Sequence, residues 1–436
     1  MTQKQHWALT CAVLQSTSSP SCGIASLRRL TFGITFAALT LGPLVHAQEW
    51  TRFRGPNGSG LGKAPNLPAE FSEKDYNWKI ELAGAGHSSP VIWGDRIFVT
   101  ATPKGTAKRI IACLNAADGK VLWQKEFDTS AYHLHADNNY SAGSAAVDAE
   151  RVYLHWAAPE GSGLVAMDQK DGHEIWKKEL GPYVSQHGPG SSPIVWEEMV
   201  IVSFDQDEPT SFLLAVDART GAQRWKLERP GTSHSASTPC IYSPKTGSAQ
   251  AILTSRTNGM TAVDVNKGTI AWELPGLMTK RCVASPFVTP AGIVIGQCGE
   301  GRSESFVYAV QPGADGKSAQ KLYEVVRSGG YVPTPIAVND LLFLWKEDGL
   351  VTCLREATKE QLWSERVSGP YYGSPVSVNG RLYNMTVRGD LVVLAAGEKF
   401  QQIARIPLGE GTEATPAVSG GRMYLRTASH LISVGK

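Results

Sequence analysis

Short apolar runs separated by polar turns follow one another along residues 76–436. Because side chains alternate between the two faces of a strand, runs of this length predict β-strands rather than helices. The Asp118-Gly119 turn between two apolar runs is typical of a β-hairpin. Residues 91–123 are therefore predicted to form four short strands, over Val91–Trp93, Arg96–Thr100, Ile110–Leu114 and Val121–Trp123.

A Gly-x-x-x-Trp unit that follows a polar turn recurs through the same region. Its copies end at Trp123, Trp176, Trp225 and Trp272, at intervals of 47 to 53 residues, and a degenerate copy ends at Trp363. The gap of 91 residues between Trp272 and Trp363 leaves room for one more copy, which Tyr323 occupies without a tryptophan. A fixed period of this size indicates a repeat architecture.

A second repeated unit is Ser-Pro or Thr-Pro followed by alternating apolar residues. Aligning the residues that follow adds a copy without proline at Ser144-Ala145, so that eight copies are visible at intervals of about 40–55 residues. The other seven are Ser89-Pro90, Ser192-Pro193, Thr238-Pro239, Ser285-Pro286, Thr334-Pro335, Ser374-Pro375 and Thr415-Pro416.

Four strands in each repeat of this length predict the blade of a β-propeller. A ring of such blades buries both faces of each one, and tryptophans between blades supply apolar area. The last repeat, residues 415–434, has about three strands, and the run Tyr76–Leu82 has the pattern of the missing fourth. We therefore predict an all-β, eight-bladed propeller of four-stranded antiparallel blades, the last closed by an N-terminal strand; the alternative is seven blades with a stray hairpin. The expected blade-docking residues are Trp78, Trp123, Trp176, Trp225, Trp272 and Trp363.

The first 47 residues have the layout of a secretory signal. Arg28 and Arg29 precede an apolar run from Leu30 to Val45, and Ala47 offers a cleavage site. The segment around the two arginines loosely resembles a twin-arginine signal, so both export routes stay open. The expected organisation is a signal peptide over 1–47, an arm over 48–76 and a propeller over 77–436, in a protein that is periplasmic or secreted and has no stable membrane span after cleavage.

Composition supports a turn-rich β-protein. Charged residues make up 19% of the chain, below the roughly 25% of ordinary globular proteins, and 44 of its 436 residues are glycine. The formal net charge is +2, but residues 1–47 hold Lys4, Arg28 and Arg29 and no acidic residue. Removing them leaves 42 − 3 = 39 basic against 40 acidic residues, which gives no support for nucleic-acid binding.

Five cysteines follow the expected signal: Cys113, Cys240, Cys282, Cys298 and Cys353. An odd number leaves at least one thiol unpaired within the chain. Cys282 and Cys298 flank a predicted strand pair, where either a disulfide or two buried thiols are compatible with the sequence. The cysteines and histidines have no spacing typical of a metal site.

The repeated Asp-Gly-x-x-x-Trp units resemble the pyrroloquinoline-quinone-type propeller repeat family over about residues 50–436. The opening Trp50–Gly60, with Tyr331–Pro335 and Glu413–Pro416, is similar to a secreted subfamily of planctomycete-type bacteria. The resemblance implies an eight-bladed propeller with tryptophan docking between blades. Members of that subfamily are described as quinone-binding-like, or as similar to the propeller subunit of outer-membrane protein assembly; those descriptions concern the fold, which does not fix a function.

The resemblance admits two functional branches. Quinoprotein alcohol and sugar dehydrogenases of the family need a base carboxylate and a Ca²⁺ set beneath the pyrroloquinoline quinone, and often carry adjacent cysteines, which this chain lacks. The carboxylate cluster that stands out, Asp205 to Glu208, follows a strand and is expected to be a solvated turn. The assembly branch is lipid-anchored, and no lipobox cysteine occurs at the expected cleavage point.

The segment that enters each innermost strand forms the rim of a propeller's channel, where ligands usually bind. A polar or aromatic residue precedes each of the eight Ser/Thr-Pro copies. Together these residues are expected to form a funnel for a small polar or anionic ligand or for a loop of a partner. These residues are His87, Tyr140, His187, His234, Arg281, Tyr331, Tyr372 and Glu413. The alternative is that they hydrogen-bond to loop backbone and channel water.

Two further places offer weaker candidates. His133 and His135 form a metal pair only if residues 128–140 are a strand, because a loop does not align the two rings. Arg54 in the glycine-rich arm binds an anion or, more simply, caps backbone carbonyls. Phosphate-binding, serine-hydrolase and zinc-protease signatures are missing from the sequence.

These observations predict an exported, non-catalytic binding or scaffolding propeller of the periplasm or cell envelope. We expect envelope proteins or a small polar ligand as its partners, no catalytic residue and no metal site. The alternatives are an alcohol or sugar dehydrogenase that depends on pyrroloquinoline quinone and Ca²⁺, an outer-membrane protein assembly subunit, and a protein that adds a partner's strand to its own sheets.

Overall fold

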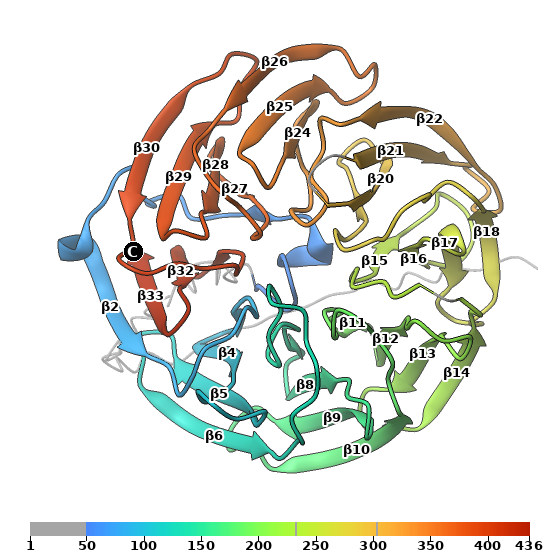
Figure 1. Ribbon diagram of the computed structural model, residues 1–436, viewed down its shortest axis with the longest axis horizontal. Helices are drawn as coiled ribbons and strands as arrows, with labels where there is room; N and C mark the ends of the chain where they lie inside the picture. The colour runs from blue at the N-terminus through green and yellow to red at the C-terminus, as the bar shows by residue number, and fades with distance from the viewer. Residues whose placement is uncertain (1–48, 232, 302–303) are drawn as a thin grey trace, which may run out of the picture. The chain divides into compact units, whose positions relative to one another are not determined.

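The computed structural model describes residues 49–231, 233–301 and 304–436, and the expected signal peptide lies outside them. The described residues form eight antiparallel sheets, each following the last around a ring (Figure 1). This confirms the predicted eight-bladed all-β propeller and excludes seven blades with a stray hairpin. Within the described residues no helix is long and apolar enough to cross a membrane.

Blades 1 to 4 follow the chain in order, and the first strand of each lies innermost. Blade 1 contains β3 (Val91–Trp93), β4 (Arg96–Ala101), β5 (Arg109–Asn115) and β6 (Val121–Phe127). Blade 2 contains β7 (Ala146–Val147), β8 (Arg151–Trp156), β9 (Ser162–Asp168) and β10 (Glu174–Gly181). Blade 3 contains β11 (Ile194–Trp196), β12 (Met199–Phe204), β13 (Phe212–Asp217) and β14 (Gln223–Glu228). Blade 4 contains β15 (Cys240–Tyr242), β16 (Gln250–Ser255), β17 (Gly259–Asp264) and β18 (Ile270–Leu274).

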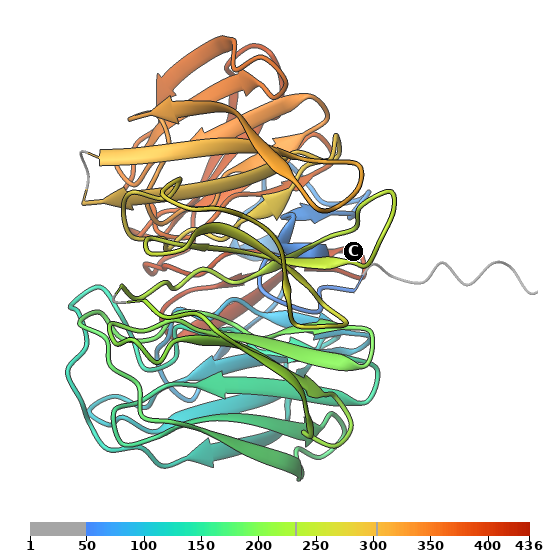
Figure 2. The ribbon, with the colours of Figure 1, turned by 90° about the vertical axis from the view of Figure 1, so that its right-hand side faces the viewer.

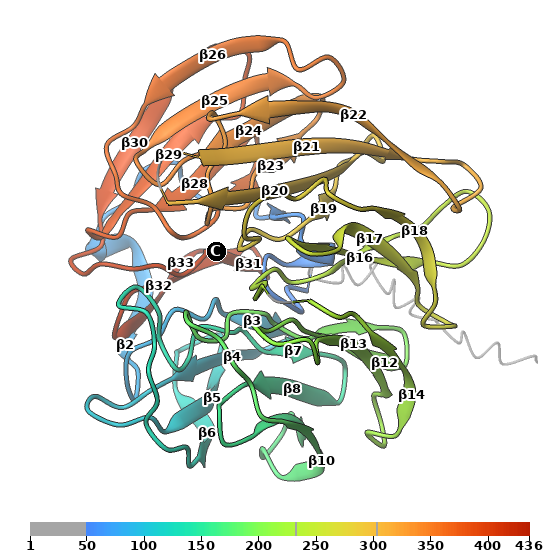
Figure 3. The ribbon, with the colours of Figure 1, turned by 45° about the vertical axis from the view of Figure 1, so that its right-hand side comes forward.

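Blades 5 to 7 repeat this order, which Figure 3 shows from centre to periphery for β19 to β22. Blade 5 contains β19 (Phe287–Val288), β20 (Val294–Glu300), β21 (Glu304–Pro312) and β22 (Ala319–Val326). Blade 6 contains β23 (Ile336–Val338), β24 (Leu341–Trp345), β25 (Leu350–Arg355) and β26 (Gln361–Arg366). Blade 7 contains β27 (Val376–Val378), β28 (Arg381–Met385), β29 (Asp390–Ala395) and β30 (Gln402–Pro407), with β1 (Leu61–Gly62) added in parallel to β27.

The eighth blade is built from both ends of the propeller. It contains β31 (Ala417–Ser419), β32 (Arg422–Arg426), β33 (His430–Gly435) and, as its outer strand, β2 (Tyr76–Glu81). β2 pairs antiparallel with β33, with Lys79 opposite Ile432 (Figure 1). The N-terminal strand thus closes the ring as predicted.

Hydrogen bonds explain why each inner strand is preceded by Ser or Thr. The backbone N–H of each motif residue donates to the hydroxyl of the motif residue in the following blade, at 2.8–3.1 Å. The circle closes where Thr415 N donates to Ser89 Oγ at 3.0 Å, and it includes Ser144, the copy without proline. Among the described residues it runs through Ser89, Ser144, Ser192, Thr238, Ser285, Thr334, Ser374 and Thr415; we call it the hydroxyl ring.

The repeated tryptophans contact the next blade along. Trp123 Nε1 donates to the Gln169 carbonyl at 2.8 Å, and Trp78, Trp176, Trp225 and Trp363 donate equivalent bonds of 2.7–3.1 Å. Trp272 instead bonds Gln250 Oε1 of its own blade, and Gln250 Nε2 reaches the Gly316 carbonyl of blade 5. At the position without a tryptophan, the Tyr323 hydroxyl donates to the Glu356 carbonyl of blade 6.

The N-terminal arm spans one end of the central channel (Figure 1). Trp50, which is fully buried, bridges Ile92 of blade 1, and Asn57 exchanges two hydrogen bonds of 2.7 Å with Ile241 of blade 4. Arg54 Nη2 donates to the carbonyls of Pro335 at 3.0 Å and of Pro375 at 3.4 Å. Two short 3₁₀ turns, η1 (Pro56–Gly58) and η2 (Glu73–Asp75), shape the arm. Arg54 therefore caps backbone carbonyls of blades 6 and 7.

The five described cysteines are all free and buried. Cys282 and Cys298 lie in one apolar cluster, between blades 4 and 5, without forming a disulfide. Of the two states that the sequence left open, the structure has the buried thiols. Burial raises the pKa of Cys240 to about 12, which keeps that thiol protonated and unreactive at neutral pH.

Candidate functional site

A cavity of about 860 Å³ occupies the centre of the ring. Segments that enter the innermost strands form its walls, and hydroxyl-ring residues such as Ser285 and Thr334 lie deeper in it. Of the described arm residues, Phe53 alone lines it, at the end that the arm spans. The cavity is therefore a cup of the size that holds small ligands rather than a through-channel. Figure 2 shows the blades from the side.

The structure brings together seven of the eight predicted rim residues. The cavity is lined by His87, His187, His234, Arg281, Tyr331, Tyr372 and Glu413. Tyr140 does not line it. Its hydroxyl donates to the Tyr132 carbonyl at 2.7 Å, and its ring meets the Tyr132 ring edge-on, with centroids 5.0 Å apart. The loop before blade 2 folds back on itself and carries Tyr140 to a separate small cavity beside Arg109.

His87, Asp137, Tyr372 and Glu413 form one side of the cup, which we call the carboxyl wall. His87 Nδ1 lies 3.2 Å from Glu413 Oε2, and the Tyr372 hydroxyl lies 3.5 Å from Asp137 Oδ2. Burial, with the nearby Asp137, raises the pKa of Glu413 to about 7. Burial, with the nearby Arg426, lowers the pKa of His87 to about 4. At neutral pH His87 is therefore uncharged, while Glu413 is close to its midpoint.

His187, Asp207, His234 and Arg281 form another side, which we call the guanidinium wall. His234 is 3% exposed, and neither of its ring nitrogens has a hydrogen-bond partner among the described residues. Burial lowers its pKa to about 3, so that the ring is neutral. The Arg281 guanidinium lies 5.1 Å from the centroid of the Tyr331 ring. Asp207 accepts backbone N–H groups from His234 at 2.7 Å and from Gln186 at 2.9 Å.

Residues 128–140 are a loop, so His133 and His135 are not aligned as they would be on a strand. His133 is exposed and does not line the cavity, whereas the His135 ring stacks on His187 with centroids 5.2 Å apart. Asn138 Nδ2 donates to the carbonyls of His187 at 2.6 Å and of Pro189 at 3.2 Å. The loop thus reaches the entrance of blade 3. Sequence reasoning missed this placement, because only the contacts across blades reveal it.

The carboxylate cluster after β12 is not the solvated turn that the sequence suggested. Asp205 is buried, and both of its carboxylate oxygens lie 3.0 Å from Arg229 Nη1. Asp207 lines the cavity, and of this acidic run only Glu208 is exposed. The expectation was wrong because Arg229, which directly follows the outer strand β14, pairs with Asp205, and no local pattern indicates this contact.

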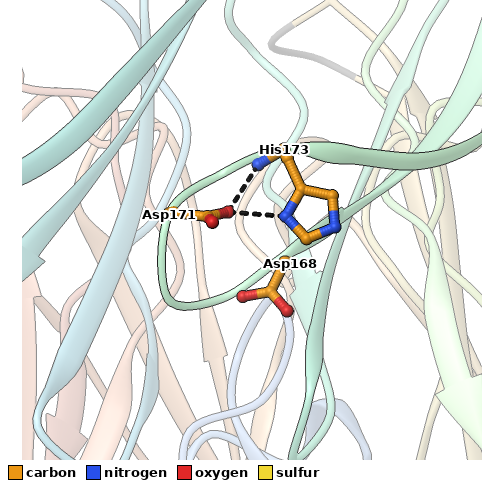
Figure 4. Close-up of side chains that lie close together, drawn as sticks. All are labelled: Asp168, Asp171 and His173. Atoms are coloured by element: carbon orange, nitrogen blue, oxygen red, sulfur yellow. Dashed lines mark hydrogen bonds and ion pairs between the residues drawn. The ribbon is translucent and has the colours of Figure 1, made fainter.

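Asp168, Asp171 and His173 form the one group among the described residues whose three acidic or imidazole ligand atoms lie within 4.8 Å of one another (Figure 4). They lie on the turn between β9 and β10, at the outside of blade 2. Asp171 accepts from His173 N at 2.9 Å and contacts His173 Nδ1 at 2.7 Å, while Asp168 accepts from Lys170 N at 2.6 Å. Hydrogen bonding within the turn therefore accounts for the cluster.

A quinone bound through Ca²⁺ needs several oxygen ligands that converge on the ion. The cavity has five acidic residues, but no three of them come within the ligand spacing that the blade 2 turn shows. Glu347 already accepts the backbone N–H groups of Tyr331 and Val332 at 2.5 and 2.6 Å. The acidic residues of this cavity therefore do not fit a Ca²⁺ set.

Comparison with solved structures shows where this fold occurs. BamB from Moraxella catarrhalis matches with a TM-score of 0.59 and 15% identity, over 82% of this chain and 96% of that one. Quinohemoprotein alcohol dehydrogenase from Comamonas testosteroni matches with a TM-score of 0.66 and 13% identity, over 89% and 80%. The computationally designed Ika8 protein matches with a TM-score of 0.58 and 11% identity, over 82% and 98%. At these identities the likeness concerns the fold alone.

Comparison with curated protein sequences finds no match. A family model does match, in three overlapping or adjoining segments that cover residues 70–203, 160–302 and 303–399. Its description is outer membrane protein assembly factor BamB. Together these segments span most of the propeller blades, in keeping with the repeat that the sequence displays. The chain therefore belongs to the BamB-like family of pyrroloquinoline-quinone-type propellers.

Proposed function

We propose that this protein is an exported, non-catalytic binding propeller of the periplasm or cell envelope, and that its central cup holds a polar ligand. The observation that carries the proposal is the cup itself. It is ligand-sized, the arm spans one of its ends, and it is lined by seven polar or aromatic residues from different blades. One of them, His234, is buried with both ring nitrogens unpartnered among the described residues.

The donors in the cup favour binding over catalysis. A general base works best when its pKa lies near the operating pH and a second group positions it. Glu413 has such a pKa and lies 3.2 Å from His87 Nδ1, but the described cavity offers no converging Ca²⁺ ligands for a quinone. The quinoprotein dehydrogenase branch is therefore the second candidate, favoured by the likeness to the Comamonas testosteroni enzyme.

The family description favours a third role, in the assembly of outer-membrane proteins, with an envelope protein as the partner. In that case a loop of the partner enters the cup in place of a small molecule. Localisation to the envelope rests on the expected signal over residues 1–47, and fractionation of cells that express the tagged protein tests it.

The test compares small-molecule retention by the mature chain with that by two tryptophan variants. Ala142 lines the cup, so Ala142→Trp fills it without removing a charge, whereas Ala117→Trp adds the same ring on an exposed turn outside it. We expect mass spectrometry after gel filtration to find polar compounds on the wild type and on Ala117→Trp, but not on Ala142→Trp. Turnover of alcohols or sugars with added quinone and Ca²⁺ overturns the proposal.

A further inference from the structure

The order of the blades places the two charged walls on opposite sides of the cup. His87 enters blade 1 and Glu413 enters blade 8, while His234 enters blade 4 and Arg281 enters blade 5. The hydroxyl ring links all eight blades in sequence order. In a closed ring of eight, blade 1 faces blade 5 and blade 8 faces blade 4. Glu413 and Arg281 therefore lie on opposite sides of the cup.

The guanidinium wall is built to accept an anion. Arg281 forms no ion pair within 4 Å among the described residues, and its contact is the Tyr331 ring, which leaves its N–H groups available. The neutral His234 ring beside it offers one further donor that has no partner in the described protein. The acids nearby are engaged, since Asp207 accepts two backbone N–H groups and Glu300 pairs with Lys280 at 3.1 Å.

The carboxyl wall is built to accept a cation. Asp137 is close enough to Glu413 to disfavour the charge of that carboxyl, and no lysine or arginine ion pair within 4 Å neutralises either residue among the described residues. Arg426, which acts on the neighbouring His87, is buried and donates to the Ser88 carbonyl. An ammonium group between the two carboxyls relieves their repulsion.

Between the walls, hydroxyl-ring residues and Phe53 offer hydrogen bonds and apolar contact. The acidic residue of this part is Glu347, whose carboxylate already accepts the backbone N–H groups of Tyr331 and Val332. A ligand that matches the whole cup thus has one negative end, one positive end and a neutral middle. A peptide of a few residues with free ends has this pattern, and each residue spans about 3.3–3.6 Å.

We propose that the cup binds short peptides whose two ends are free, with the terminal carboxylate at Arg281 and His234 and the terminal ammonium at Glu413 and Asp137. This inference rests on the proposed function, because it names the ligand class of the same cavity. Specificity comes from the two ends, so side chains of the peptide matter less than its length and its terminal charges.

Calorimetry with four forms of trialanine tests the inference: unmodified, N-acetylated, C-amidated, and blocked at both ends. Trialanine has uncharged side chains, so that its ends carry all of its charge. We expect each single block to weaken binding to the mature chain at least about tenfold, because each block removes one charge and the hydrogen bonds that the charged end makes. The doubly blocked form is expected to bind most weakly.

Two variants assign the ends. In Arg281→Gln, amidation of the peptide is expected to weaken binding no further, while acetylation still weakens it. In Glu413→Gln, acetylation is expected to weaken binding no further, while amidation still weakens it. The matched controls are Arg388→Gln and Glu365→Gln, exposed residues that do not line the cup, which are expected to bind all four forms like the wild type. Circular dichroism establishes that every variant is folded before its affinity is compared.

The outcomes separate this inference from the proposed function. If the doubly blocked peptide binds as tightly as the unmodified one, the cup binds the peptide without recognising its terminal charges, and the inference is wrong. The inference is also wrong if no form of trialanine binds while the wild type, but not Ala142→Trp, retains other polar compounds. If nothing at all is retained, both the inference and the proposed function fail.

Discussion

At the scale of single residues, the contact between tryptophan and glycine explains the recurring motif. The Trp176 ring of blade 2 lies over Gly221 of blade 3, where an added Cβ would come within 2.7 Å of the ring. Gly221 also has φ 71°, a backbone conformation that side chains disfavour. The glycine and the tryptophan of one Gly-x-x-x-Trp copy therefore serve two different interfaces, one with the preceding blade and one with the following blade.

Replacing Gly221 by Ala is expected to destabilise the protein more than replacing Gly380 does. Both glycines have φ 71°, but nothing lies within 4 Å of a Cβ built on Gly380. Gly380→Ala is therefore expected to cost about 1–2 kcal/mol from the backbone alone, and Gly221→Ala a further contribution for displacing the Trp176 ring. Urea unfolding measures both; equal losses would show that the ring moves aside freely.

Glu413 makes stability depend on pH in a direction opposite to that of most carboxyls. Its pKa rises to about 7 on folding, so the folded chain holds this proton more tightly than the unfolded chain. Its contribution is complete below the ordinary pKa of 4.5 and is lost as the pH rises through 7. The groups that face it are His87, Asp137 and Tyr372, and His87 stays uncharged across this window.

Glu413→Gln is therefore expected to raise the midpoint of thermal unfolding, relative to the wild type, more at pH 8 than at pH 5. Scanning calorimetry at the two values measures the difference. Glu365→Gln, on the exposed outer strand β26, is the control and is expected to show little dependence on pH. A difference between wild type and Glu413→Gln that is the same at both values would contradict the shift of this pKa.

At the scale of elements, the blades are joined near the centre by the hydroxyl ring and farther out by the tryptophans. Both sets of contacts run from one blade to the next, so each blade except blade 7 has an inner and an outer contact with the blade that follows it. Blade 7 lacks the outer contact, because Ala404 stands opposite Val393 where the other outer strands carry a Trp or Tyr. Its inner strand β27 instead pairs with β1 of the arm, with Leu61 opposite Ser377.

Thr238→Val tests one link of the hydroxyl ring. Valine keeps the shape of the side chain but removes the oxygen that accepts the buried Ser192 N–H at 3.1 Å. An N–H left without a partner costs about 1–3 kcal/mol, so the variant is expected to lose that much in free energy of unfolding. Thr269→Val, on an exposed turn, is the control. A loss no larger than that of the control would show that water replaces the hydroxyl.

At the scale of the whole molecule, closing the ring depends on an N-terminal strand that pairs with the C-terminal strand. β2 is the outer strand of blade 8, and Trp78 Nε1 donates to the Ala116 carbonyl of blade 1 at 3.1 Å. Removing the strand leaves β33 with an open edge and blade 1 without its tryptophan contact. The same deletion removes the arm, which spans the end of the cup that Phe53 lines.

A chain that starts at residue 83 is therefore expected to lose cooperative unfolding and to aggregate, whereas one that starts at residue 49 is expected to unfold like the intact protein. Urea unfolding followed by tryptophan fluorescence, with light scattering, compares the two chains. A cooperative, monomeric transition for the shorter chain would show that seven complete blades and one partial blade close the ring without β2.

Periodicity and local motifs were sufficient to predict the blades, their number and the closing strand. Alternation of apolar residues, turn residues and the Gly-x-x-x-Trp spacing are local consequences of strand geometry, which is why Tyr76–Leu82 was recognised as a missing strand. The same alignment predicted seven of the residues that line the cup, because the position before each inner strand repeats with the blade. Tyr140 was the exception, since its loop folds back in a way that no repeat indicates.

Tertiary structure alone decided which of those residues are charged, paired or free. The burial of His234, the approach of Asp137 to Glu413 and the pairing of Asp205 with Arg229 involve residues 24 or more positions apart in the chain. It also decided that Cys282 and Cys298 remain thiols and that the arm spans the channel. The physical reason is that pKa values and unsatisfied donors depend on distances between blades, whereas strands and turns depend on neighbours within one blade.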